Sequence, residues 1–365
     1  MADLATTVRN QFFGTWPELL EYQDRIHVIY PGFHRSHNRS PESIIEEILK
    51  ELQAGKTKFV FLEAVEALME YDIPRLDAVL ELLDSKVPPS DIFYWTSAID
   101  SEQNYKRIHN RVNLISSFYW EKLFDYSKDW PNKDYDIRIK DKNFLCFNHL
   151  QREHRVQLLN KLLPTGLIDK SFYSFVGHGD MQEFAMSLPD DEGASYNHIK
   201  LNVDKLPMDL NYRITGEDAG KTVVSDLEYY ENSYFSLVTE TIFFKERGHH
   251  AYETDDRLFL TEKTFKPIFA QHPFLIVASE GHLAALRNLG YKTFHPYIDE
   301  TYDTVESDYD RLEMIIEEVK RLCNQTDEEW IVWQAGIKEI VEFNKQHFLA
   351  RTDHRITKDI VKYFI

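Results

Sequence analysis

Strand-like and helix-like segments alternate along most of this chain, and this alternation restricts its possible folds more than any other feature. In the first part, strand-like runs at 25–30, 58–62 and 91–95 are separated by helix-like segments at 41–52 and 74–83. The helix at 41–52 has a cap in Ser40 and a proline in its first turn, which both favour a helix start. Alternation of this kind predicts a parallel sheet with helices on both faces.

The pattern breaks over 125–141, a polar stretch that contains Pro131, and then begins again. We therefore expect a linker there, between a first domain at 1–137 and a second at 138–343. Both are expected to be doubly wound α/β domains, whose ligands bind at the carboxyl ends of the strands. The elements predicted in the second part are strands at 143–147, 171–176, 234–241 and 273–278, and helices at 153–163, 261–271, 281–288, 309–323 and 327–348.

Composition narrows the class of protein further. The 365 residues carry a net charge of −19, which disfavours a dedicated nucleic-acid binder because an acidic chain repels a polyanion. Residues 299–329 hold twelve acidic and three basic side chains, and we expect them to form a solvated loop and helix face. Cys146 and Cys323 are far apart in the sequence and lack the spacing of metal ligands, so we expect neither a cysteine metal site nor a disulfide framework. Neither a signal peptide nor a membrane-spanning run of ~18 apolar residues is visible, which predicts a cytoplasmic protein.

The segment RLFLTEKTFKPIFAQHPFLIVA carries the strongest chemical signal. Glu262 and Lys263 stand side by side at the expected start of a helix that Thr261 caps, and Lys266 lies one helical step further on. A carboxylate can accept hydrogen bonds from the two hydroxyls of a ribose, while an ammonium and a helix N-terminus attract phosphate. The alternative interpretation is an ordinary surface ion pair at a helix start.

Two further clusters follow predicted strands. FNHLQREHR places Asn148, Arg152, His154 and Arg155 where a strand leads into a helix, which favours an anion site; the alternative is a helix start with surface arginines. In SYFSLVTET, polar residues that include Thr239 and Glu240 end a strand and could meet a ligand, although a simple strand-to-loop transition is equally compatible.

The order SYFSLVTET, a spacer, then FLTEKTFKPIFAQHPFLIVAS resembles the donor-binding core of the α-1,3-fucosyltransferases. It is similar, more loosely, to exostosin-type glycosyltransferases and to viral and bacteriophage proteins of this kind. The resemblance covers about residues 234–279. It departs from the family pattern at 238–241, where VTET replaces the family's F-E-N, and in a longer spacer that contains KERGHH.

This resemblance implies a GT-B architecture, in which two Rossmann-like domains face each other and a C-terminal helix, here 344–365, returns to the first domain. Glu262 would bind the ribose of a UDP- or GDP-linked sugar, and Lys263 with Arg155 or Arg152 would contact the diphosphate. The implied enzyme is a metal-independent hexosyl- or pentosyltransferase. Its acceptor would be a hydroxyl of a glycan or of a hydroxymethylated DNA base, in the host cytoplasm if the protein is viral.

An inverting transfer also needs a base that takes the acceptor's proton. The candidates in the first domain are Glu63, which directly follows a strand, Asp100, and His34 with its neighbour His37. Each has an alternative as a loop residue or a helix cap. Two other functions stay open at this level: a non-catalytic module that binds a nucleotide or a glycan, and an α/β enzyme that acts on phosphorylated metabolites.

Overall fold

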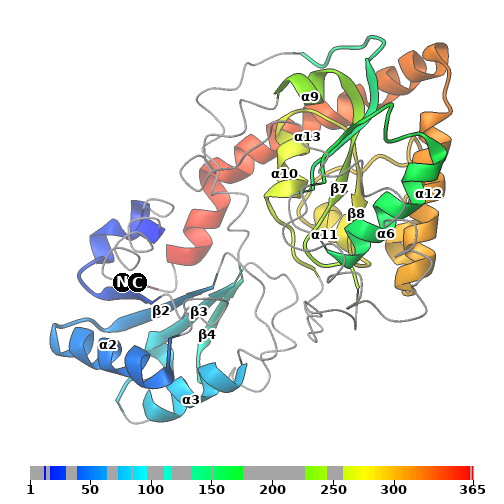
Figure 1. The fold of residues 1–365 in the computed structure, drawn as a ribbon. Helices are drawn as coiled ribbons and strands as arrows, with labels where there is room; N and C mark the ends of the chain where they lie inside the picture. The colour runs from blue at the N-terminus through cyan, green and yellow to red at the C-terminus, as the bar shows by residue number, and fades with distance from the viewer. Residues whose placement is uncertain are drawn as a thin grey trace, which may run out of the picture. The chain divides into compact units, whose positions relative to one another are not determined.

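The computed structural model describes residues 12–13, 17–29, 39–63, 73–83, 86–96, 111–116, 134–148, 152–175, 227–244, 258–361 and 364. The chain divides into two compact units, the first made of Met1–Leu123, Tyr252–Leu260 and Ala350–Ile365, the second of Phe124–Ala251 and Thr261–Leu349. Each unit contains a parallel four-stranded sheet, which confirms the expected α/β class (Figure 1). The domain limits at 137 and 343 stay a prediction.

In unit 1 the strands lie in the order in which they follow one another along the chain. They are β1 (Ile26–Ile29), β2 (Lys58–Glu63), β3 (Ile92–Thr96) and β4 (Asn113–Ser116), the last of which the sequence pattern did not indicate. The helices are α2 (Pro41–Gln53) and α3 (Ile73–Leu83), with 3-10 turns η1 (Pro17–Tyr22) and η4 (Pro89–Asp91). Ser40 caps α2 as expected, because its side chain accepts from the backbone N–H of Ser43.

Successive residues of β2 pack on opposite faces of this sheet. Phe59 and Phe61 meet the apolar sides of α2 and α3, whereas Val60 and Leu62 pack on the other face with Trp95. This is the two-residue period of a strand that is buried on both faces. Since the described strand order never reverses, right-handed crossovers place α2 and α3 on the same face. The described part of unit 1 therefore lacks the reversal of a doubly wound sheet.

In unit 2 the strand order does reverse. The strands β5 (Lys142–Cys146), β6 (Phe172–Tyr173), β7 (Ser233–Thr239) and β8 (Phe274–Val277) pair in the order β6-β5-β7-β8. The helices are α6 (Glu153–Leu162), α9 (Leu227–Glu231), α10 (Glu262–Phe269), α11 (His282–Asn288), α12 (Asp308–Cys323) and the first part of α13 (Asp327–Val361), with 3-10 turns η6 (Leu163–Thr165) and η10 (Thr301–Thr304). The part of α13 from Ala350 onward belongs to unit 1. The reversal makes β5 and β7 neighbours, and their carboxyl ends form a topological switch point.

Helices on both faces keep this switch point in place. On one side α12 packs against α6. On the other side Phe265 and Phe269 of α10 contact Phe348 of α13, with ring centroids 6.0 and 5.8 Å apart. Pro267 lies inside α10 without ending it, since the helix continues to Phe269. The switch point is thus built on a packed three-layer scaffold.

Two sequence-based expectations are corrected here. Separate helices were expected at 327–348 and 344–365, but α13 is one helix from Asp327 to Val361, because neither proline nor glycine follows Gly336 within it. The acidic tract is not uniformly solvated: Asp303 is buried and accepts from the backbone N–H groups of Leu283 (2.9 Å) and Ala284 (3.0 Å) at the start of α11. Free N–H groups at a helix start need such an acceptor.

Within the described ranges, none of the helices is both long enough and apolar enough to cross a bilayer.

Candidate functional site

All ten predicted binding residues belong to the carboxyl-terminal edge of the unit 2 sheet and to the helices that begin there. They are Asn148, Arg152, His154, Arg155, Thr239, Glu240, Thr261, Glu262, Lys263 and Lys266. Hydrogen bonds and charge interactions connect them into one cluster, which we call the switch-point cluster. Residues more than 100 positions apart in the chain thus meet at the place where open α/β sheets bind ligands.

A side-chain hydrogen bond joins the two strand ends directly. The Thr239 hydroxyl donates to Asn148 Oδ1 over 2.7 Å, and the backbone N–H of Asn148 donates to Ser174 Oγ over 3.0 Å. Both Asn148 and Thr239 are buried. Their polar groups therefore hold β5, β6 and β7 in register at this edge and face one another rather than solvent.

Glu240 is the centre of the scaffold. Its fully buried carboxylate accepts from the Thr261 N–H (3.0 Å), the Thr261 hydroxyl (2.7 Å), the Thr264 hydroxyl (2.6 Å) and the Thr241 N–H (3.2 Å). These bonds tie the end of β7 to the first turn of α10. Because its oxygens are occupied by protein donors, Glu240 acts as a positioning residue for the start of α10.

His154 and Arg155 point inward, although the sequence pattern suggested cations that face a ligand. His154 Nε2 lies 3.0 Å from the Glu240 carbonyl and its ring stacks on Phe243. Burial, with the charges of Arg155 and Arg152, brings the pKa of His154 well below its ordinary value, so the ring is neutral at pH 7. Arg155 donates to the Thr239 carbonyl over 3.1 Å. Burial and Arg152 lower the pKa of Arg155 to about 10, which leaves it charged.

Glu262 and Lys263 are the accessible part of the cluster. Their side chains are 21% and 29% exposed, and Lys263 Nζ lies 3.0 Å from Glu262 Oε1. Burial alone would raise the pKa of Glu262, but the charges of Lys263 and Lys266 outweigh it and lower that pKa. Lys263 Nζ also donates to Thr261 Oγ1 over 3.0 Å. An ionised carboxylate and an ammonium are thus presented together at the N-terminus of α10.

Arg152 contributes a third charged group. It is the N-cap residue of α6 and is half-buried, whereas Arg155 in the first turn of that helix is buried. The charge of Arg152 lowers the pKa of both His154 and Arg155, which places it beside the inner part of the cluster. The starts of α6 and α10 therefore both lie at this edge of the sheet, and each carries a half-buried cation, Arg152 or Lys263. This arrangement is suited to binding an anion.

Arg311 completes the scaffold and was not predicted from the sequence. Its guanidinium is buried and donates to the carbonyls of Ala278 (3.0 Å), Phe243 (3.0 Å) and Val305 (2.7 Å), and it pairs with Asp308. It also lies 4.7 Å from the centre of the Phe243 ring. Arg311 thereby joins α12 to the segments that follow β7 and β8. The only local signal was the i,i+3 pair with Asp308.

The side chains of the predicted catalytic bases lie outside the part of the chain that the structure describes. Glu63 is the last residue of β2 in unit 1, and its side chain lies outside the description. Asp100, His34 and His37 lie outside the described residues altogether. Their roles stay predictions. Among the side chains that the structure describes, no group of three His, Cys, Asp or Glu residues is arranged to hold a metal ion.

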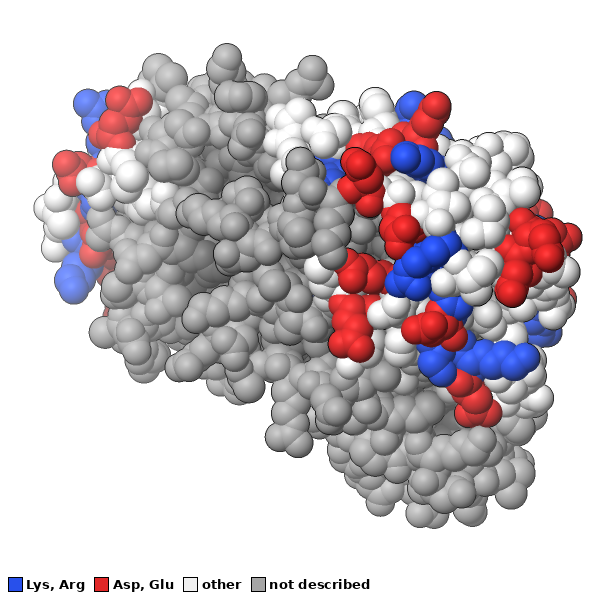
Figure 2. All heavy atoms as spheres, turned by 90° about the horizontal axis from the view of Figure 1, so that it is seen from above, with Lys and Arg blue, Asp and Glu red and all other residues white. Residues whose placement is uncertain are grey.

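The surface charge is mixed. Figure 2 shows basic and acidic side chains interspersed over the described surface of the face in view, with no extended region of either sign among them.

Comparisons of this chain with protein-family models, with curated proteins and with solved structures found no match.

A second buried histidine of unit 2 predicts acid sensitivity. The His272 ring accepts from the Ser236 hydroxyl (2.7 Å) and donates to the Ser233 carbonyl (2.9 Å), and burial lowers its pKa to about 3. The unfolded chain therefore binds a proton first, near pH 6.5. Stability should fall as the pH drops from 6.5 toward 3, by about 3 kcal/mol between pH 7 and 4 from this group.

Urea unfolding of the wild type and of His272→Gln, each at pH 7 and pH 4, checks this prediction. Carboxylates titrate in both proteins, so the difference between the two pH dependences isolates the histidine. Equal losses of stability in the two proteins would contradict it.

Proposed function

We propose that this chain is a glycosyltransferase that moves a sugar from a UDP- or GDP-linked donor to a hydroxyl acceptor. The observation that supports it is the position of the accessible Glu262–Lys263 pair, at the first turn of α10 beside the switch point of the unit 2 sheet. A nucleotide-sugar presents a ribose diol and a diphosphate close together, and this pair offers one group for each. The proposal includes a GT-B arrangement in which the two units face each other and 344–365 returns to the first domain.

In the proposed reaction, Glu262 accepts hydrogen bonds from the ribose hydroxyls, and its lowered pKa keeps it ionised for this task. Lys263 and Arg152, with the positive end of the α10 helix dipole, stabilise the negative charge that develops on the departing diphosphate. The transfer then needs no metal. Glu240, Thr261 and Arg155, which are buried, hold the start of α10 and the end of β7 in position. Glu63, Asp100 or His34 takes the proton of the acceptor hydroxyl, on a glycan or a hydroxymethylated DNA base.

A non-catalytic module that binds a nucleotide or a glycan is the second candidate. The supporting observation is that the switch-point cluster, as described, contains binding groups but no general base: Glu262 has a lowered pKa, and His154 is buried against the Glu240 carbonyl. Release of nucleoside diphosphate from a nucleotide-sugar, without added acceptor, would distinguish an enzyme from such a module.

Replacing Glu262 by alanine is expected to weaken donor binding by about 10- to 100-fold, since one charge-assisted hydrogen-bonding group contributes roughly 1.5–3 kcal/mol. The measurement is the thermal shift of the full chain with UDP-, GDP- and CMP-linked sugars. A donor at 100 times its dissociation constant stabilises by about 2.7 kcal/mol, and the substitution should remove about half of this at 10-fold weaker binding and most of it at 100-fold weaker binding.

Glu317→Ala is the matched control, because Glu317 is a well-exposed glutamate on α12 that pairs only with neighbouring Lys320 among the described side chains. It should leave the shift unchanged. A well-folded wild type that none of the donors stabilises would overturn the proposed function, and equal shifts in Glu262→Ala and wild type would remove Glu262 from the site.

A further inference from the structure

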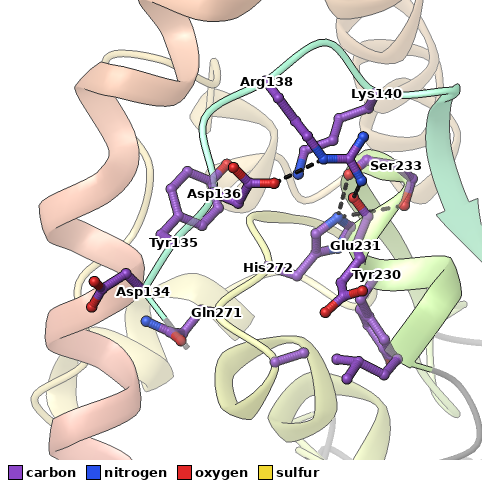
Figure 3. Close-up of a pocket in the computed structure, with 12 residues that line it drawn as sticks. Asp134, Tyr135, Asp136, Arg138, Lys140, Tyr230, Glu231, Ser233, Gln271 and His272 are labelled. Atoms are coloured by element: carbon purple, nitrogen blue, oxygen red, sulfur yellow. Dashed lines mark hydrogen bonds and ion pairs between the residues drawn. The ribbon is translucent and has the colours of Figure 1, made fainter. Parts of the chain in front are cut away.

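A cavity of about 260 Å³ lies at the opposite edge of the unit 2 sheet (Figure 3). It is formed where the chain enters β5, at the first residue of β7 and just before β8, so it borders the amino-terminal ends of these parallel strands. The switch-point cluster occupies the carboxyl-terminal ends. The cavity is therefore a separate feature, and it is slightly smaller than the ~300–1,000 Å³ of pockets for drug-sized ligands.

Lys140 is the distinctive side chain of this cavity. Its backbone N–H donates to the Tyr234 hydroxyl over 3.1 Å, which fixes the start of its side chain. In the part of the chain that the structure describes, its ammonium has no hydrogen bond or ion pair. The neighbouring cation Arg138, in contrast, bonds to Asp136 (2.8 Å), to Asn232 Oδ1 (2.7 Å) and to the Glu231 carbonyl (3.0 Å).

The surroundings favour the uncharged amine of Lys140. Burial lowers its pKa to about 8, and the adjacent charge of Arg138 lowers it as well, while Asp136 and Glu231 oppose the shift. At pH 7 roughly a tenth of the side chains are then neutral, against less than a thousandth for an ordinary lysine. A lysine desolvated in a pocket beside another cation is a recognised form of activated nitrogen nucleophile. Figure 3 shows Arg138, Lys140 and Asp136 together on one side of the cavity.

We propose that Lys140 is a nucleophilic amine that forms an imine with a small, uncharged hydroxyaldehyde bound in this cavity. The neutral Nζ attacks the carbonyl carbon to form a C–N bond. The carbonyl oxygen then takes up the two protons that Nζ loses and leaves as water, so no oxidant or reductant is needed. Asp136 and Glu231 lie close enough to act on the charge of Lys140 and can relay these protons.

The charge of the lining selects an uncharged compound. Asp134, Asp136 and Glu231 line the cavity together with the two cations Arg138 and Lys140, so the lining carries three acids against two bases. An anionic compound would meet net repulsion, whereas carboxylates readily accept hydrogen bonds from the hydroxyl groups of a neutral one.

The test is reductive trapping on the full chain. The protein is incubated at pH 7 with D-glyceraldehyde and cyanoborohydride, which reduces an imine to a stable amine, and labelling of each lysine is followed by peptide mass spectrometry. Lys140 is expected to react at least ~10-fold faster than Lys142, with a rate that saturates with glyceraldehyde and rises with pH around 8. Lys142 is the internal control, since its ammonium donates to the Asp169 carbonyl.

Two lysine variants and a second carbonyl compound test the assignment to Lys140 and the preference for an uncharged compound. Lys140→Arg keeps the positive charge and should abolish the fast labelling, whereas Lys142→Arg should leave it intact. Pyruvate, an anionic carbonyl compound, is a ketone and reacts more slowly with any amine, so its rate at Lys140 is divided by its rate at Lys142; this ratio should be lower with pyruvate than with glyceraldehyde. Equal rates at Lys140 and Lys142 with glyceraldehyde in the wild type would overturn the proposal without any variant, and the same ratio with pyruvate would overturn the preference for an uncharged compound.

Discussion

Replacing Glu240 by alanine is expected to destabilise unit 2 by about 3–5 kcal/mol. The substitution removes the carboxylate that accepts from Thr261 and Thr264 at the start of α10 and from the Thr241 N–H after β7, and it leaves these buried donors without this acceptor. It also leaves the buried guanidinium of Arg155 with less compensating negative charge. For a protein of ordinary stability, such a loss is a large share of the total free energy of unfolding.

Urea unfolding of the full chain measures this loss. Glu317→Ala again serves as the control, because its exposed carboxylate should contribute less than about 1 kcal/mol. Glu240→Gln retains the shape of the side chain and should fall between the wild type and alanine. A Glu240→Ala protein as stable as the Glu317→Ala control would show that Glu240 does not hold the start of α10.

The second large effect is expected for Arg311→Met, again about 3–5 kcal/mol. Methionine retains most of the apolar contact but removes the donors that satisfy the carbonyls of Ala278, Phe243 and Val305. The buried carbonyls of Ala278 and Phe243 then lose this donor, and the Asp308 carboxylate loses its ion pair with Arg311. Because the affected segments follow β7 and β8, the backbone amides of residues 241–244 should also lose protection from hydrogen exchange.

Lys320→Met on the same helix is the matched control, since its ion pair with Glu317 is exposed and should contribute little. Hydrogen exchange of the amides in residues 241–244, compared between the two variants, tests the local part of this prediction. Unchanged protection of this segment in Arg311→Met, with stability equal to that of the control, would contradict it.

The local pattern was sufficient for most elements that later form the switch-point cluster. The apolar runs that became β5, β7 and β8 and the cap at Thr261 were visible in the sequence, because strand periodicity, buried runs and capping depend on neighbouring residues. The same pattern indicated which residues lie at strand ends. It did not indicate β4 or the full length of α13.

What the side chains do at those strand ends depended on the tertiary structure. Glu240 and Glu262 are both glutamates at the ends of apolar runs, yet one is enclosed by donors from α10 and the other is accessible. Likewise Arg152 and Arg155 are three residues apart in one motif, but only Arg155 reaches the carbonyl of Thr239. No local rule separates these cases, since each partner comes from a distant part of the chain.

Parallel α/β sheets, and acidic and basic side chains at one helix start, could be predicted from the amino-acid sequence alone, since these properties follow from periods of a few residues. The β6-β5-β7-β8 order, and with it the switch point that brings Asn148 to Thr239, is visible in the tertiary structure alone. The cavity around Lys140 likewise arises from the tertiary structure, at the amino-terminal edge of the sheet, for which the sequence pattern predicted no function. Strand order and cavities depend on long-range pairing and on the burial of charges, and neither is encoded in the spacing of neighbouring residues.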